Sequence, residues 1–159
     1  MYRLTDTDYD QFQRDGYVVA RSLLDVDEVE LLSEVSRADR QMADDADGRA
    51  AVDGGPVKLL VKNELAADDI YGAIVRSERI VRTMELLLGD EVYHYHNKMI
   101  LKEPHVGGAW EWHQDYGYWY DNGCLLPTMA SCLIAVDRAT RENGCLQVLA
   151  GSHQMGRAN

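Results

Sequence analysis

The sequence has 159 residues, of which 46% are hydrophobic and 27% charged, and this length and composition predict one globular domain rather than a disordered tail. Its formal net charge is −11 and it has no run of Lys or Arg, so we expect neither nucleic acid nor a membrane surface as a partner. Its first fifteen residues are polar and acidic and its apolar stretches are short, which predicts a cytoplasmic protein without a signal peptide or membrane span.

Helices are predicted in the first part of the chain. Thr5 is a suitable N-cap for a helix that Gly16 would end. A short apolar run over 17–20 predicts a strand. Asp25, followed three residues later by Glu28, predicts a capping box at the start of a second helix.

The middle of the chain alternates between turn signals and regular elements. An acidic loop is expected over 44–48 and a Gly-Gly-Pro turn over 54–56. A strand is predicted over 58–62. Two consecutive helices are predicted over 68–88, with Ser77 capping the second.

The pattern changes near residue 91 to a period of two that is rich in Tyr, Val and Ile. Strands are predicted at 92–102, 112–116, 131–136 and 146–149. A loop is predicted over 104–108. The expected organisation is therefore a single α+β domain over 1–159, helical over about 1–90 and β-rich over about 91–159.

Three cysteines are present, an odd count without a closely spaced pair: Cys124, Cys132 and Cys145. This is a poor disulfide framework and contains no zinc-binding spacing. We expect buried free thiols in a reducing compartment.

The segment with candidate chemistry is Trp112-His113-Gln114-Asp115. On an extended strand, residues two apart point to the same face, so His113 and Asp115 would present an imidazole and a carboxylate together. These are two of the three ligands in the facial triad of non-haem Fe(II) oxygenases. His-x-Asp alone is a weak motif, and a surface imidazole–carboxylate hydrogen bond is the alternative. The aromatic residues around it suit either a dry pocket or simple core packing.

Three separated segments of the chain resemble the phytanoyl-CoA dioxygenase family of Fe(II)- and 2-oxoglutarate-dependent oxygenases. They are residues 12–19, which continue into Leu23-Leu24; residues 112–115; and residues 135–148 together with Gly151-Ser152-His153. They span nearly the whole chain and keep the order of the family. After the iron motif, the Tyr-Gly-Tyr-Trp run looks closer to bacterial small-molecule hydroxylases than to the acyl-CoA enzyme.

The resemblance implies a double-stranded β-helix of the jelly-roll or cupin type, with N-terminal helices packed on one sheet. It implies an oxygenase that uses Fe(II), 2-oxoglutarate and O2 to hydroxylate a small molecule, with His113 and Asp115 as iron ligands. Lys98 would contact 2-oxoglutarate. The alternative, which has equal weight, is that Lys98 is a solvent-exposed strand residue without a role in the site. Further residues implied for the cofactor pocket are Ser131 and Leu133, and for the substrate pocket His96, Trp110, Tyr116 and Trp119.

The resemblance also implies that the site is incomplete at the C-terminus. In the family, the second iron histidine and the arginine for 2-oxoglutarate lie beyond position 159, and His153 belongs to a structural turn. The chain would then be a fragment, or be completed by another chain, or be a non-catalytic relative. A small-molecule or partner-binding module and a cupin-like metal enzyme without 2-oxoglutarate are the rival functions. The sequence leaves the substrate and the oligomeric state open.

Overall fold

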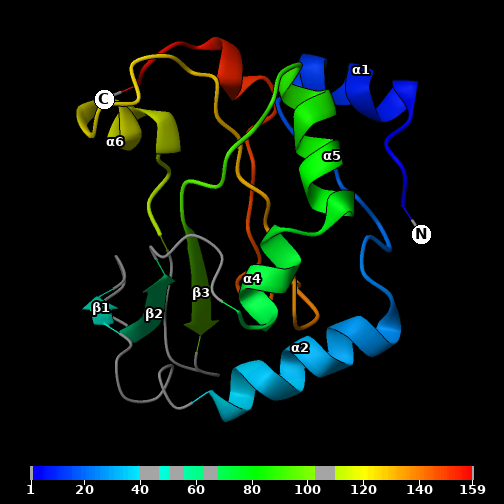
Figure 1. Ribbon diagram of the computed structural model, residues 1–159. Helices are drawn as coiled ribbons and strands as arrows, with labels where there is room; N and C mark the ends of the chain where they lie inside the picture. Colours follow the sequence, from blue (N-terminus) through cyan, green and yellow to red (C-terminus); the bar gives the residue numbers. More distant parts are fainter. Residues whose placement is uncertain (1, 40–46, 51–55, 63–67, 103–109, 159) are drawn as a thin grey trace.

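The computed structural model describes residues 2–39, 47–50, 56–62, 68–102 and 110–158 (Figure 1). Its elements, in chain order, are α1 (Asp6–Asp15), α2 (Val26–Ala38), β1 (Asp47–Ala50), β2 (Pro56–Lys62), α4 (Ile70–Val75), α5 (Glu78–Leu88), β3 (Asn97–Lys102), α6 (Asp115–Asp121) and the 3-10 turn η1 (Ser152–Gln154). In this described part, every helix is too short or too polar to cross a membrane.

α1 begins and ends at the residues that the sequence predicted, and α2 and α5 begin at the predicted caps, whereas α6 starts in a segment that was predicted to be a strand. The side chains of Thr5, Asp25 and Ser77 each accept a hydrogen bond from a backbone N–H in the first turn of α1, α2 and α5. Gly16 and Gly89 end α1 and α5 with φ angles of 80° and 74°, in the left-handed region that a residue without Cβ adopts without strain. The predicted caps at Thr5, Gly16, Asp25 and Ser77 are confirmed, because a cap depends only on residues three or four apart.

The described strands form one antiparallel sheet in the order β1-β2-β3. Leu59 of β2 lies opposite Asp47 of β1 on one side and Ile100 of β3 on the other. The strand predicted over 58–62 is confirmed. The strand predicted over 92–102 is too long, because pairing begins only at Asn97.

Three predictions fall partly or wholly outside the described residues. Of the acidic loop over 44–48, residues 47 and 48 lie in β1, and the rest is not described. Of the turn over 54–56, only the last residue is described, as the start of β2. The loop predicted over 104–108 lies outside the described residues.

Four predicted strands are wrong: 17–20, 112–116, 131–136 and 146–149. Alternation in the sequence indicates an extended backbone, but a strand also requires a neighbour that completes its hydrogen-bond ladder. None of these four segments has such a partner among the described residues. The β-rich C-terminal part and the double-stranded β-helix are therefore not seen in the described part of the chain.

The buried core is formed by α2, α4 and α5. Its large hydrophobic residues are Leu32, Tyr71, Ile80 and Leu87. Figure 1 shows α4 between α2 and α5, with the sheet to one side of them. The cysteines are free as predicted, but Cys132 is exposed and the other two are half-buried, so their expected burial is wrong.

Candidate metal site

The imidazole of His113 and the carboxylate of Asp115 meet at the N-terminal end of α6. His113 Nε2 lies 3.3 Å from Asp115 Oδ1. The strand that was expected to bring them together is absent, because Gln114 is the N-cap of α6 and Asp115 is its first residue. The two side chains converge where an irregular segment enters a helix, and not on one face of a strand.

A hydrogen bond at the other ring nitrogen of His113 fixes the tautomer of the imidazole. His113 Nδ1 lies 2.7 Å from the backbone oxygen of Glu111. A carbonyl oxygen only accepts, so Nδ1 carries the proton and donates it. In the neutral ring, Nε2 then directs its lone pair at the Asp115 carboxylate. Two electron-pair donors converge, and a cation held between them, or a proton on Nε2, would relieve their repulsion.

The predicted cofactor residues are only partly gathered at this pair. Ser131 Oγ lies 3.5 Å from Asp115 Oδ2 and donates to it, so a segment 16 residues away reaches the site. Lys98 is an exposed residue of β3, and His96 directly precedes this strand. Leu133 is 62% exposed.

Aromatic rings connect His96 to α6. The His96 and Trp119 rings lie 4.7 Å apart, and Trp119 also contacts Tyr95 at 5.0 Å. Burial lowers the pKa of His96, and the charge of Lys98 lowers it further, whereas the Asp115 carboxylate opposes the shift. His96 and Asp115 therefore share one electrostatic environment, in which the imidazole tends to stay neutral.

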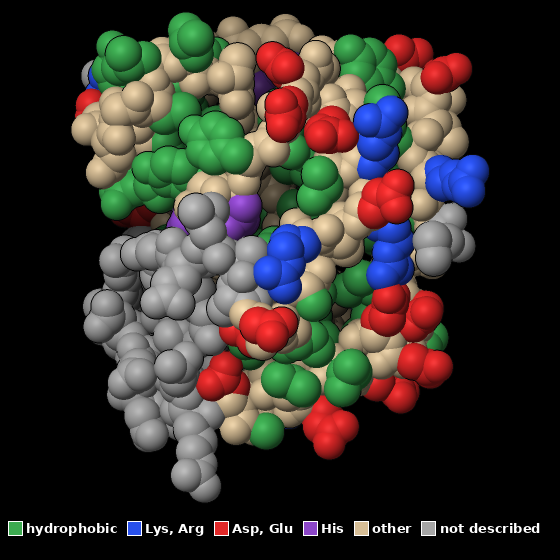
Figure 2. Space-filling model, viewed as in Figure 1, with side chains coloured by type: hydrophobic (Ala, Val, Ile, Leu, Met, Phe, Trp, Pro, Cys, Tyr) green, Lys and Arg blue, Asp and Glu red, His purple; other side chains and the backbone are tan. Residues whose placement is uncertain are grey.

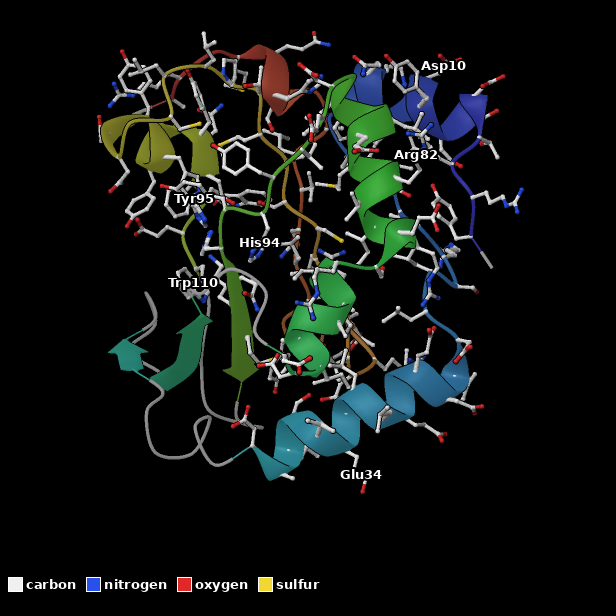
Figure 3. The ribbon with its side chains drawn as sticks, viewed as in Figure 1. Asp10, Glu34, Arg82, His94, Tyr95 and Trp110 are labelled. Carbon is white, nitrogen blue, oxygen red and sulfur yellow. The ribbon has the colours of Figure 1, made fainter. Side chains whose placement is uncertain are left out.

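The remaining aromatic candidates have distinct surroundings. Trp110 lies beside His113, with ring centroids 6.3 Å apart. The Tyr116 hydroxyl donates to the backbone oxygen of Leu125 at 3.0 Å, which ties α6 to the loop that follows it. Figure 3 shows Tyr95 and His94 on opposite sides of the backbone before β3. Both ring nitrogens of His94 are buried without a hydrogen-bond partner among the described residues.

The pair is open to solvent in the described structure. The side chains of His113 and Asp115 are 57% and 48% exposed. The predicted dry aromatic pocket is therefore not seen here, and Trp112 is itself 71% exposed. Figure 2 shows hydrophobic side chains gathered on the surface in the region of α6.

A third metal ligand is not found beside the pair. No group of three or more His, Cys, Asp or Glu side chains that could hold a metal occurs among the described residues. His105 lies outside the described residues. His153 has a structural contact: its Nε2 lies 3.1 Å from the backbone oxygen of Gln13 in α1 and donates to it.

Gln114 is the site residue that sequence reasoning missed. Its side-chain amide forms two hydrogen bonds, to the backbone of Gly156 at 2.8 Å and of Ala158 at 2.9 Å. These partners lie 42 and 44 residues away, so no local spacing in the sequence signals them.

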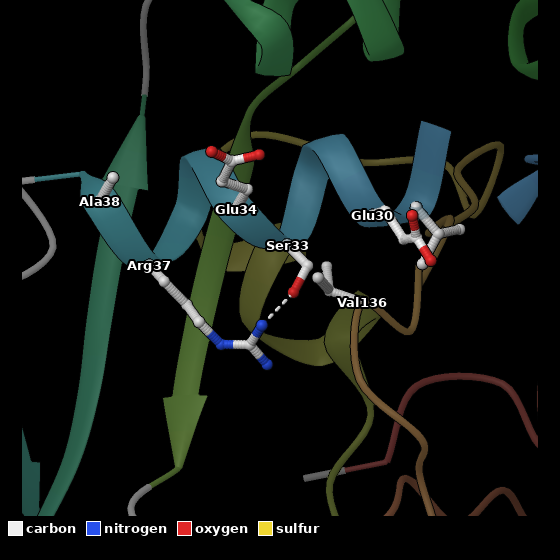
Figure 4. Close-up of a pocket in the computed structure, with 7 residues that line it drawn as sticks. Glu30, Ser33, Glu34, Arg37, Ala38 and Val136 are labelled. Carbon is white, nitrogen blue, oxygen red and sulfur yellow. Dashed lines mark hydrogen bonds between the residues drawn. The ribbon is translucent and has the colours of Figure 1, made fainter. Parts of the chain in front are cut away.

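An open hollow along α2 contains none of the motif residues (Figure 4). It is lined by Val29, Glu30, Ser33, Glu34, Arg37, Ala38 and Val136. Arg37 donates to Ser33 and, at 2.5 Å, to Asp137. Its guanidinium is therefore already engaged by groups beside the hollow.

Comparison with known proteins places almost the entire chain in one family. The family model described as Phytanoyl-CoA dioxygenase (PhyH) matches residues 12–159. This range includes the His113–Asp115 pair and all the other candidate residues named above.

Characterised relatives carry hydroxylase and dioxygenase names. The chain is 39% identical over 90 residues to L-proline trans-4-hydroxylase of Streptomyces griseoviridis, which covers 56% of this chain and 34% of the relative. It is 29% identical over 156 residues to ectoine dioxygenase of Streptomyces avermitilis, covering 95% of this chain and 52% of the relative. A similar match to ectoine dioxygenase of Stutzerimonas stutzeri has 26% identity over 149 residues, or 91% and 49% of the two chains. The chain thus spans about half or less of the length of these relatives.

Proposed function

The chain belongs to the phytanoyl-CoA dioxygenase family, and from this premise we propose that it carries the iron-binding part of an Fe(II)- and 2-oxoglutarate-dependent oxygenase that hydroxylates a small molecule. Enzymes of this family generally depend on Fe(II) and 2-oxoglutarate, and their fold is in general a cupin-like double-stranded β-helix. The relatives named for L-proline and ectoine are hydroxylating dioxygenases, which supports the reaction class.

The observation that carries the proposal is the convergence of His113 Nε2 and Asp115 Oδ1 at 3.3 Å. The Nδ1 bond to Glu111 leaves Nε2 as the coordinating atom. A histidine oriented by a backbone carbonyl is a frequent arrangement at metal sites. One imidazole and one carboxylate are the donor types of the non-haem Fe(II) triad, so the residues present fit two of its three positions.

When bound, iron and 2-oxoglutarate supply the O2 activation and C–H oxidation that no side chain here provides. The chain's residues hold and orient the reactants. His113 and Asp115 bind the iron, and Ser131 orients the Asp115 carboxylate through its hydroxyl. We propose Lys98, Ser131 and Leu133 as cosubstrate contacts.

We further propose that the substrate lies against the aromatic group beside the pair, which consists of His96, Trp110, Tyr116 and Trp119. The His96 ring rests on Trp119 at 4.7 Å and its pKa is lowered, so it would present a neutral polar edge. L-Proline and ectoine are the first compounds to test, because relatives are named for them.

The third iron ligand and the arginine for 2-oxoglutarate would come from outside the described residues. A longer form of this chain or another chain would supply them. If neither does, the protein is a non-catalytic relative that binds a small molecule or partner. The half-exposed His113 and Asp115 side chains favour this second candidate function for the chain in isolation.

Metal and cosubstrate binding separate these functions. We expect Mn²⁺ with 2-oxoglutarate to raise the melting temperature, because a ligand that binds only the folded state stabilises it. His113→Ala should abolish the metal-dependent part of the shift. Trp112→Phe is the control, because Trp112 is exposed and adjacent to His113, and this variant should retain the full shift. A metal shift that 2-oxoglutarate leaves unchanged would favour a cupin-like metal enzyme.

Turnover is the decisive measurement for the oxygenase. Succinate formation should require Fe(II), 2-oxoglutarate and a substrate, tested first with L-proline and ectoine. Metal binding that survives His113→Ala would contradict the proposed site, whatever the turnover.

A further inference from the structure

The residue between the two proposed ligands is anchored to a distant segment. Gln114 Nε2 donates to the backbone oxygen of Gly156 at 2.8 Å, and Gln114 Oε1 accepts from the backbone N–H of Ala158 at 2.9 Å. Both ends of the amide are thus used by one stretch of backbone. A side chain held at both ends has one orientation, so Gln114 is fixed by partners more than 40 residues away, whereas the Glu111 partner of His113 is local.

The same stretch of backbone is also bound by α6. Arg157 donates to Asp121 at 2.8 and 3.1 Å, and its guanidinium lies 4.4 Å from the centre of the Tyr120 ring. A Cβ at Gly117 would lie 2.9 Å from the Ala158 oxygen, so only glycine permits this approach. Figure 1 shows the C-terminal end of the chain lying beside α6.

The stretch is held at its other end by α1. The Gly151 N–H donates to the Asp15 oxygen at 2.8 Å, and His153 Nε2 donates to the Gln13 oxygen at 3.1 Å. Residues 151–158 are here called the strap. In Figure 1 the strap crosses from α1 to α6. It connects the helical part of the molecule to the proposed metal site.

We infer that Gln114 is a positioning residue, which uses the strap to hold His113 and Asp115 in a single metal-binding arrangement. The inference rests on the proposed function. Gln114 is the N-cap of α6, yet its side chain makes no capping hydrogen bond and reaches the strap instead. α6 has only seven residues, and its first turn frays unless other contacts hold it. Fixing Gln114 fixes the junction at which His113 and Asp115 turn towards each other.

The test compares three variants of the full chain. Gln114→Leu has a similar size and removes both amide bonds. Gln114→Glu keeps an acceptor for the Ala158 N–H and loses the donor to Gly156. Gln147→Leu is the matched control, since Gln147 is an exposed glutamine outside the strap and the motif. Melting temperatures are measured first, and every binding experiment is run well below the lowest of them.

The first readout is Co²⁺ binding, followed by its visible absorption, with Co²⁺ standing in for iron. We expect Gln114→Leu to weaken Co²⁺ affinity about tenfold, the lower end of the loss seen when the groups that orient a metal ligand are removed. Gln114→Glu should lie between Gln114→Leu and the parent chain, and Gln147→Leu should match the parent. A purely structural Gln114 would lower the melting temperature and leave affinity and absorption unchanged.

The second readout needs no metal. The nuclear Overhauser contact between the His113 ring and the Asp115 side chain is measured in the metal-free chain. We expect it in the parent and in Gln147→Leu, and its loss in Gln114→Leu. Persistence of this contact in Gln114→Leu would overturn the inference. Co²⁺ binding that is unaffected by His113→Ala would instead contradict the proposed function. In that case, the nuclear Overhauser contact between His113 and Asp115 would still decide whether Gln114 positions them.

Discussion

At the scale of single residues, the contact between Glu28 and Arg79 is the clearest electrostatic feature. Arg79 of α5 donates to Glu28 of α2 and, at 2.8 Å, to the backbone oxygen of Leu23. The hydrogen bond from Arg79, followed by that from the Asp25 N–H, lowers the pKa of Glu28 from 4.5 to about 2. The Glu28 carboxylate therefore couples two helices through Arg79 and also closes the capping box of α2 through the Asp25 N–H.

This contact makes stability depend on pH in a defined window. Because the folded state lowers the pKa of Glu28, the contribution is fully present above about pH 4.5 and is lost as the pH falls towards 2. We expect Glu28→Gln to lower the urea midpoint at pH 6 and to remove part of its decrease between pH 5 and 2.5. At pH 6, Arg79→Met should cost less in the Glu28→Gln background than in the parent, because only its bond to the Leu23 oxygen then remains to be lost. Equal pH slopes in the parent and Glu28→Gln would contradict this assignment.

The residue scale also separates what the sequence could predict from what it could not. Thr5, Asp25 and Ser77 were predictable as caps because each accepts from a backbone N–H within its own first turn. The contacts of Gln114 were not predictable, because its partners lie more than 40 residues away. The convergence of His113 and Asp115 was expected from a strand, but the structure produces it at a helix N-terminus.

At the scale of elements, alternating sequence predicted exposure better than it predicted pairing. Before β3, the side chains of Val92, His94 and His96 are half-buried, whereas Tyr93 and Tyr95 are 83% and 54% exposed. The period of two is thus real, yet the ladder begins only at Asn97. Side-chain alternation is a property of the local backbone, while pairing depends on a partner supplied from elsewhere in the chain.

The junction between α1 and the strap gives a prediction at this scale. A Cβ at Gly16 would lie 2.4 Å from His153 Nδ1, and Gly16 has a φ of 80°. At Gly89 the φ is 74°, but nothing lies within 4 Å of the added Cβ. Gly16→Ala therefore combines backbone strain with a collision, whereas Gly89→Ala has the strain alone.

We expect both alanine variants to be less stable than the parent, and Gly16→Ala to be the worse by about 1–3 kcal/mol, the usual cost of overpacking. The free energy of unfolding from urea titrations measures this difference. Hydrogen exchange at the Gly151 amide, which donates to Asp15, should also be faster in Gly16→Ala. Equal losses in the two variants would show that His153 moves aside without cost.

At the scale of the whole molecule, the order of elements was only partly predictable. Helices do precede β3, and the core forms from α2, α4 and α5 as their apolar periodicity requires. The described C-terminal segments lack the predicted strands, although the family fold is in general a double-stranded β-helix. The chain spans about half of the length of the ectoine dioxygenases that it matches. In its described part, the sheet contains β1, β2 and β3 and none of these C-terminal segments.

The described segments after α6 expose several leucine side chains. Leu125 and Leu126 are 64% and 67% exposed, and Leu133, Leu146 and Leu149 are 62%, 63% and 59% exposed. Exposed apolar surface of this kind promotes association or binds hydrophobic dyes. We therefore expect the isolated chain to bind anilinonaphthalene sulfonate and to self-associate as its concentration rises.

Replacing Leu125 and Leu126 together by Gln should reduce both dye binding and self-association, because it removes apolar area without changing buried contacts. Leu31→Gln is the control, since Leu31 is 55% exposed but lies on α2. Dye fluorescence and sedimentation velocity measure the two effects, and the far-ultraviolet circular dichroism should stay constant. If Leu31→Gln reduced association as much as the double variant, the interacting surface would not be specific to the leucines after α6.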